Sequence, residues 1–243
     1  MTNGAERIIV ALDFSTAKEG LDMVDLLQGR VSFFKVGMEL FTSTGPDIIK
    51  ALHGRGCKVF LDLKFHDIPN TVKRTCDIVL EFGVELFNLH ASGGSEMMAQ
   101  ASRALREGAI ALGKRAPSLL AVTILTSIDD KILNEELGVA HSVKEQVVHF
   151  ARMAKEAGVN GVVASPLEIK AIRQACGEDF CIVTPGVRPA WAVKGDQRRV
   201  MTPSEAINHG ADYIVVGRPI TASSNPLEAA KRISEEIEEA LAQ

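Results

Sequence analysis

The chain has 243 residues, of which 46% are hydrophobic and 24% are charged, and its formal net charge is −4. This length suits one large domain, and the hydrophobic content is enough for a sizeable buried core. The sequence has no strongly basic field of the kind that binds nucleic acid or an anionic membrane, so we expect neither as a partner.

Apolar segments alternate regularly with helical patterns along the chain. The predicted strands are residues 8–12, 33–36, 59–63, 85–89, 119–124, 161–164, 181–184 and 213–216. The predicted helices are residues 16–27, 44–53, 70–82, 96–112, 143–157, 167–175, 204–208 and 226–241. Near-continuous apolar strands with short connections predict a parallel sheet covered by helices.

Eight such units are the number in a (β/α)8 barrel, so we predict an α/β protein with one TIM-barrel domain over residues 1–243. An open, doubly wound sheet is the alternative. No G-x-G-x-x-G motif follows the first strand, which counts against a dinucleotide-binding fold of that kind.

Polar residues cluster at the carboxyl ends of the predicted strands, where the active sites of barrels lie. They are Asp13, Lys35, Asp62, Lys64, His90, Thr123, Thr126, Pro185, Arg188, Gly217 and Arg218. Because these ends meet at one mouth, we expect the side chains to converge on one site. Each also has a plainer interpretation: Asp13 as a cap of the first helix, for example, or Lys35 as a lysine that reaches the surface.

The run from residue 62 to residue 72 is the most informative stretch. Side chains alternate along a strand, so Asp62 and Lys64 share the inward face of Phe60. Charges on a buried face are costly unless they are paired, which indicates either chemistry or a structural ion pair. Asp67 adds a second carboxylate just before Ile68 and the proline that should open a helix, where it could also serve as an N-cap.

The segment Gly217-Arg218-Pro219 is the best candidate for binding a phosphate. It follows the last strand, glycine exposes a backbone N–H group, and arginine recognises phosphate with two hydrogen bonds. A long polar loop, residues 186–202, lies beside it in the predicted fold and is placed to act as a lid over an anion. This loop contains Arg188, Gln197, Arg198 and Arg199.

The four cysteines are Cys57, Cys76, Cys176 and Cys181, and they form no CxxC pair or zinc pattern with histidines. We expect them to be reduced thiols. The first residues show no signal-peptide pattern, and no apolar run approaches the roughly 18 residues that cross a bilayer. These features predict a cytoplasmic protein.

Taken together, the motifs resemble those of the bacterial orotidine 5′-phosphate decarboxylase family. They are the Asp62-x-Lys64-x-x-Asp67-Ile68-Pro69-Asn70-Thr71 core, Ala11-Leu12-Asp13, Phe34-Lys35-Val36-Gly37, Thr184-Pro185-Gly186-Val187-Arg188 and Val216-Gly217-Arg218-Pro219-Ile220. The D-x-K-x-x-D core alone is typical of a wider barrel superfamily. Its combination with Lys35, Gln197 and Arg218 is more specific, and the match runs from the first strand to the last helix.

The resemblance implies decarboxylation of orotidine 5′-monophosphate to uridine 5′-monophosphate, the last step of de novo pyrimidine synthesis, without a metal or cofactor. It implies a catalytic array of alternating charge made of Lys35, Asp62, Lys64 and Asp67. It also implies a homodimer in which Asp67 and Thr71 reach the active site of the partner subunit. Lys64 would stabilise and then protonate a carbanion at C6 of the pyrimidine.

The resemblance also implies which residues would bind the substrate. Asp13 and Lys35 would hold the ribose hydroxyls, and Thr126 and the loop at Pro185 would meet the pyrimidine. The residues implied for the phosphate are Arg188, Gln197, Gly217 and Arg218.

Three other functions stay open at this stage. Sugar-phosphate enzymes of the same superfamily use magnesium, but they typically carry a carboxylate where this chain has Lys35. A phosphate-binding barrel isomerase of the tryptophan or histidine pathway would not need the array of Asp62, Lys64 and Asp67. A barrel that only senses nucleotides would have little use for a buried lysine between two acids.

Overall fold

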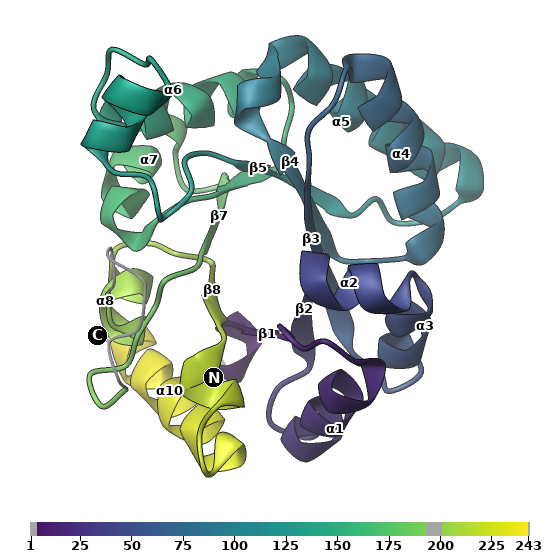
Figure 1. Cartoon of the computed structure of the whole chain (residues 1–243), viewed down its shortest axis with the longest axis vertical. Helices are drawn as coiled ribbons and strands as arrows, with labels where there is room; N and C mark the ends of the chain where they lie inside the picture. The colour runs from purple at the N-terminus through teal and green to yellow at the C-terminus, as the bar shows by residue number, and fades with distance from the viewer. Residues whose placement is uncertain (1–3, 193–200, 243) are drawn as a thin grey trace.

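The computed structural model describes residues 4–192 and 201–242, and its eight parallel strands close into one barrel in sequence order (Figure 1). The strands are β1 (Ile8–Ala11), β2 (Phe33–Gly37), β3 (Lys58–Phe65), β4 (Leu86–His90), β5 (Ser118–Val122), β6 (Gly161–Val163), β7 (Cys181–Thr184) and β8 (Tyr213–Val216). Pairing of β1 with both β2 and β8 closes the ring. The predicted (β/α)8 barrel is confirmed, and the open sheet is wrong.

Helices surround the ring of strands on the outside (Figure 1). They are α1 (Ala17–Leu27), α2 (Met38–Thr44), α3 (Asp47–His53), α4 (Pro69–Phe82), α5 (Gly94–Leu112), α6 (Val143–Glu156), α7 (Ile169–Cys176), α8 (Pro203–Asn208), α9 (Arg218–Thr221) and α10 (Pro226–Leu241). Short helical turns occupy Gly4–Arg7, Ala91–Gly93, Ile132–Glu136 and Pro166–Glu168. The sequence did not predict α2, which starts directly after β2, or α9.

Alternating side chains of the strands form two apolar layers. In β1, Ile8 and Val10 face the helices, whereas Ile9 and Ala11 face the barrel interior. The interior layer consists of Ile9, Ala11, Phe33, Phe60, Leu86, Leu120, Val183 and Val215, all at most 8% exposed. Because side chains repeat every second residue, the next inward positions toward the mouth include Asp13, Lys35 and Asp62.

The cysteines are unpaired, as expected for reduced thiols: Cys57, Cys76 and Cys176 are buried and Cys181 is partly buried. Burial raises the pKa of both Cys76 and Cys181 to about 12, although Arg173 and Arg7 act against this at Cys181. In the part of the chain that the structure describes, no helix is long and apolar enough to span a membrane.

Candidate active site

The centre of the site is an irregular stretch at the end of β3. Phe60 and Leu61 pair with Leu86 and Phe87 of β4, but the next pair is Phe65 with Leu89, so β3 contains two more residues than β4 over this interval. Within this bulge Lys64 has a φ of 54°, the only positive φ of a described residue other than glycine. A left-handed conformation costs a residue with a Cβ about 1–2 kcal/mol, so the surrounding structure must hold it in place.

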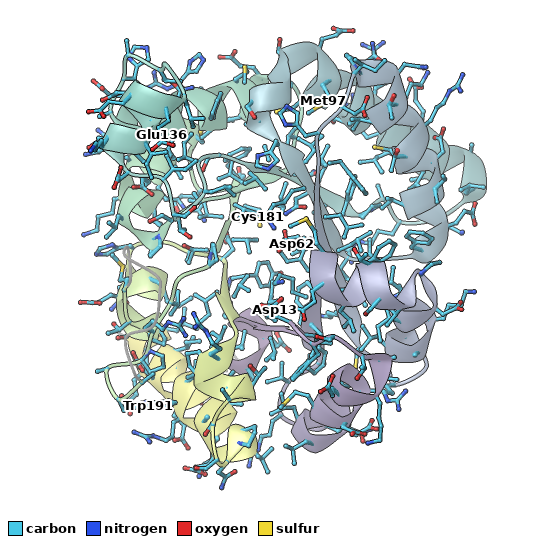
Figure 2. The ribbon with its side chains drawn as sticks, viewed as in Figure 1. Asp13, Asp62, Met97, Glu136, Cys181 and Trp191 are labelled. Atoms are coloured by element: carbon cyan, nitrogen blue, oxygen red, sulfur yellow. The ribbon has the colours of Figure 1, made fainter. Side chains whose placement is uncertain are left out.

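Four charged side chains form a row of alternating sign across the mouth. Lys35 Nζ lies 2.9 Å from Asp13 Oδ1 and 3.4 Å from Asp62 Oδ2. Lys64 Nζ lies 2.8 Å from Asp62 Oδ1, so Asp62 binds both lysines. Figure 2 shows Asp13 and Asp62 toward the middle of the ring of strands. We call Asp13, Lys35, Asp62 and Lys64 the charge row.

The inner members of the charge row are well shielded from water. The side chains of Lys35 and Asp62 are 10% and 12% exposed, whereas that of Asp13 is 59% exposed. Burial acts to raise the pKa of Asp62, but the adjacent Lys35 and Lys64 outweigh it, and the pKa lies below its usual value. Burial acts to lower the pKa of Lys35, but Asp62 and Asp13 outweigh it, and the pKa lies above its usual value. Both inner groups therefore stay charged at neutral pH.

Two residues of β4 that we had not assigned to the array interact with it, Asn88 through hydrogen bonds and His90 through electrostatics. Asn88 is fully buried, donates a hydrogen bond from Nδ2 to Asp62 Oδ1 at 2.7 Å, and accepts one from the Lys64 backbone N–H at 2.8 Å. The ring of His90 lies 5.4 Å from that of His66. Burial and the neighbouring His66 and Lys64 lower the pKa of His90, against a smaller opposing effect of Asp62.

Asp67 and Thr71 make no ion pair or side-chain hydrogen bond with the charge row among the described residues. Both are exposed, at the start of α4, and Ile68 between them is 67% exposed. Asp67 Oδ1 accepts only the N–H of Ile68 among the described hydrogen bonds, and no ion pair joins it to Lys64. Ile68 is the N-cap of α4, without a side-chain cap. The interpretation of Asp67 as a helix cap is therefore wrong. The interpretation of Asp13 as a helix cap is also wrong, because Thr16 caps α1.

Three adjoining cavities run outward from the charge row. The inner cavity, about 250 Å³, is lined by Lys35, Asp62 and Lys64 on one side and contains the predicted Thr126 and Pro185. Its other lining residues are largely apolar: Phe60, Val122, Ile124, Leu125, Val163, Ala164 and Val215, with Ser127 as a further polar one. The middle cavity, about 200 Å³, shares Lys35 and Pro185 with the inner one.

The middle cavity ends between two arginines. It is lined by Asp13, Gly217, Arg188 and Arg218, and the last two also line an outer cavity of about 340 Å³ that contains Trp191. Arg188 is 8% exposed, and its Nε has no hydrogen-bond partner among the described atoms. Burial and the neighbouring Arg218 lower the pKa of Arg188. A buried donor beside a second cation is what an anion-binding pocket requires.

Gln197 lies outside the described residues, as do Arg198 and Arg199 of the predicted lid. Trp191, which follows β7, lies under the guanidinium of Arg232 at 4.4 Å, so it packs against α10 near the outer edge of the molecule (Figure 2). Over residues 4–192 and 201–242, no group of three or more His, Cys, Asp or Glu side chains is close enough to hold a metal ion.

The sequence profile of the "Orotidine 5'-phosphate decarboxylase / HUMPS family" matches residues 6–233. The chain belongs to this family. It is 52% identical to the orotidine 5′-phosphate decarboxylase of Moorella thermoacetica, over 96% of this chain and 92% of that protein. It is also 52% identical to that of Heliobacterium modesticaldum, over 98% of both chains.

Solved structures agree with this membership of the orotidine 5′-phosphate decarboxylase / HUMPS family. The crystal structure of orotidine 5′-phosphate decarboxylase from Lactobacillus acidophilus superimposes with a TM-score of 0.84 at 43% identity, and covers 96% of this chain and 99% of that one. The resemblance noted in the sequence is therefore confirmed at the level of the family and the fold.

Proposed function

We propose that this protein is a carboxy-lyase that converts orotidine 5′-monophosphate to uridine 5′-monophosphate and CO2, the last step of de novo pyrimidine nucleotide synthesis. The observation that carries the proposal is the charge row beside an inner cavity, with two arginines at the far end of the adjoining cavity. One end suits a pyrimidine that develops negative charge, and the other end suits its 5′-phosphate.

Lys64 is the residue to which we assign the chemistry. Loss of CO2 from C6 leaves an electron pair in the plane of the pyrimidine ring, where the ring cannot delocalise it. A cation fixed beside C6 before the reaction stabilises this carbanion without reorganisation, and its proton can then be transferred to C6. Lys64 lines the inner cavity, and its Nζ is held by Asp62 Oδ1 at 2.8 Å, which suits both tasks.

The neighbouring residues would position the nucleotide. Lys35 lines both the inner and the middle cavity and Asp13 lines the middle one, so both lie between the pyrimidine end and the phosphate end, where they would bind the ribose hydroxyls. Thr126 and Pro185 line the inner cavity and would contact the pyrimidine. Binding energy from a phosphate held far from C6 can still lower the barrier if it is used to close a loop over the substrate.

At the phosphate end, Arg188 and Arg218 would bind the 5′-phosphate together with Gly217 at the start of α9. The resemblance adds Gln197 to this set. A dianion between the two arginines would remove their mutual repulsion, which contributes to the lowered pKa of Arg188.

The deciding assay follows the loss of orotidylate absorbance with purified protein in EDTA. We expect full turnover, because the position that carries a carboxylate in the magnesium-dependent sugar-phosphate enzymes is occupied here by Lys35, whose ammonium would repel a cation. Turnover that stops on chelation and returns with Mg²⁺ would favour those relatives. No turnover of orotidylate in either condition would refute the proposed reaction.

We also propose a homodimer with shared active sites, in which Asp67 and Thr71 complete the site of the partner. Their exposure at the start of α4, beside an exposed Ile68, supports this, as does the lack of an ion pair between Asp67 and any cation among the described residues. In a twofold dimer the Lys64→Ala and Asp67→Asn variants should each be nearly inactive. A mixture that exchanges subunits should recover roughly a quarter of wild-type activity, since about half the dimers are mixed and each has one intact site.

If Asp67 acts within its own chain, every site of a mixed dimer keeps one lesion and no activity returns. Native mass spectrometry of the mixture establishes that exchange has taken place. We further propose that residues 1–243 act as one domain, without a cofactor, in the cytoplasm.

A further inference from the structure

Asn88 occupies the point where the ladder between β3 and β4 is interrupted. It lies between Phe87 and Leu89, the residues of β4 that pair with Leu61 and Phe65, so it faces the bulge that contains Asp62 and Lys64. Its side chain is fully buried, although β4 is otherwise apolar up to His90. A buried amide in an apolar strand is costly unless its donor and acceptor atoms are both used.

Both ends of the Asn88 amide bind the charge row. The Oδ1 atom accepts the backbone N–H of Lys64 at 2.8 Å, so a side-chain oxygen of β4 satisfies a donor that the bulge displaces from the regular ladder. The Nδ2 atom donates to Asp62 Oδ1 at 2.7 Å. Lys64 Nζ donates to the same carboxylate oxygen at 2.8 Å.

We propose that Asn88 is a positioning residue that sets the geometry of Lys64 in two ways, by fixing its left-handed backbone and by orienting the carboxylate that binds its ammonium. The proposal rests on the function proposed above, because Lys64 is the group that meets C6. Lys64 is thereby constrained at both ends of its side chain. Asn88 itself lines none of the three cavities, so it acts through Lys64 and Asp62 and not on the substrate.

The Asn88→Ala variant tests the backbone constraint. We expect kcat to fall by about 10²-fold, the order produced when a reacting group is misplaced by about 1 Å, with little change in the affinity for uridine 5′-monophosphate. In its crystal structure the φ of Lys64 should leave the left-handed region. Asn160→Ala is the matched control, since Asn160 Oδ1 also accepts a strand N–H, that of Leu119, but at the opposite end of the barrel. It should keep kcat within about twofold.

The Asn88→Asp variant has nearly the same shape and tests the link to Asp62. It keeps an acceptor for the Lys64 N–H but places a second carboxylate against Asp62. The charged or titratable groups that face this pair are Lys35 on β2, Lys64 on β3 and His90 on β4. Two adjacent carboxylates share one proton at low pH and repel each other once both are ionised. We therefore expect kcat of this variant to fall as the pH rises, over a range in which the wild-type kcat is level.

These results separate the inference from the proposed function. If the wild type turns over orotidylate but Asn88→Ala retains kcat within about threefold, or the Asn88→Asp profile follows the wild type, Asn88 is not a positioning residue. If the wild type has no such activity, the function is wrong, and the φ of Lys64 in the variants still decides whether Asn88 fixes that backbone. Should Asn88→Ala fail to fold, the pH profile and crystal structure of Asn88→Asp decide alone.

Discussion

Replacing Lys35 with methionine removes the central cation of the charge row and leaves a side chain of similar length. We expect the free energy of unfolding to decrease, and the decrease to depend on pH. The reason is that Lys35 is bound on one side to Asp62, which is buried, and on the other side to Asp13, which is exposed.

The two contacts of Lys35 contribute very unequally. Because the carboxylate of Asp13 is 59% exposed, water screens its pair with Lys35, which should contribute about 1 kcal/mol. For Asp62, unit charges 3.4 Å apart interact by about 5 kcal/mol at an effective dielectric constant of 20. This is an upper bound, because Asp62 keeps its bonds to Lys64 and Asn88 and the variant no longer buries an ammonium. A decrease of about 2–3 kcal/mol at neutral pH is therefore expected.

The dependence on pH follows from the pKa of Asp62. In the wild type burial raises this pKa, but Lys35 and Lys64 bring it below 3.8, so the carboxylate stabilises the fold above pH 3.8 and the benefit is lost as pH falls through the lowered pKa. In the variant burial is opposed by fewer partners, so the pKa of Asp62 rises. The variant then loses stability, relative to the wild type, as pH rises through that raised pKa.

Urea unfolding at several pH values between about 4 and 7.5 measures this difference. It should be small at the acid end and widen toward neutral pH. Lys50→Met is the matched control, because Lys50 pairs with Asp47 and both side chains are 80% exposed. Its effect should stay within about 0.5 kcal/mol at every pH. A difference between Lys35→Met and wild type that is constant over the range would refute the reasoning.

Lys64→Ala should lower kcat, measured under steady-state conditions, by at least about 10³-fold without unfolding the protein. This factor corresponds to a loss of roughly 4 kcal/mol of transition-state stabilisation. Arg218→Ala should instead raise KM, because the variant loses a charged hydrogen bond to the phosphate. Such a bond contributes about 1.5–3 kcal/mol, so steady-state kinetics should show an increase of about 10- to 100-fold. Gly37→Ala would place a Cβ 2.7 Å from Lys35 Nζ, so the ammonium must move, and kcat/KM should fall about tenfold with little change in Tm. Arg173→Met should lower the free energy of unfolding by about 3–5 kcal/mol in urea titrations, because the buried guanidinium donates to several backbone carbonyls and to a carboxylate.

Each of these variants has a control or a contrary result. If the kcat of Lys64→Ala stayed within a factor of about ten of the wild-type value, the mechanism assigned to Lys64 would be excluded. An unchanged KM in Arg218→Ala would remove that residue from the phosphate site. Gly54→Ala, whose Cβ would meet only ordinary contacts beyond 3.4 Å, should leave kcat/KM unchanged. Arg55→Ala breaks a pair with a half-exposed partner and should cost no more than about 1 kcal/mol, so a loss as large as that of Arg173→Met would contradict the argument from burial.

The fold could be predicted because the apolar strands of a barrel are buried on both faces and stand out in the sequence. The convergence of Asp13, Lys35, Asp62 and Lys64 followed from the same regularity, since strand ends meet at one mouth. Helix α2 was missed because it begins directly after Gly37, without a polar N-cap, and a glycine and a proline separate it from α3.

Asn88 was missed although a signal was present. It lies two residues after the inward-facing Leu86, so a polar side chain there must face the barrel interior and needs partners. The bulge in β3 had no such signal, because it depends on the register of β3 against β4 and on a hydrogen bond between residues 24 positions apart. If a second chain completes the site, the role of Asp67 cannot be seen in the structure of one chain. The role of Gln197 stays a prediction, because this residue lies outside the described residues.

The interior apolar layer of the barrel also limits the path by which the product CO2 can leave the site. Its side chains fill the barrel beneath the charge row, and Phe60 and Val215 also line the inner cavity, so the cavity is closed on the side of the barrel interior. A nucleotide bound from the pyrimidine end to the phosphate end would fill the inner and middle cavities. Carbon dioxide formed beside Lys64 then cannot leave through the barrel interior and has to leave on the side where the nucleotide is bound. The lifetime of CO2 beside the carbanion, and hence the chance that it adds back, would depend on how firmly the nucleotide is held.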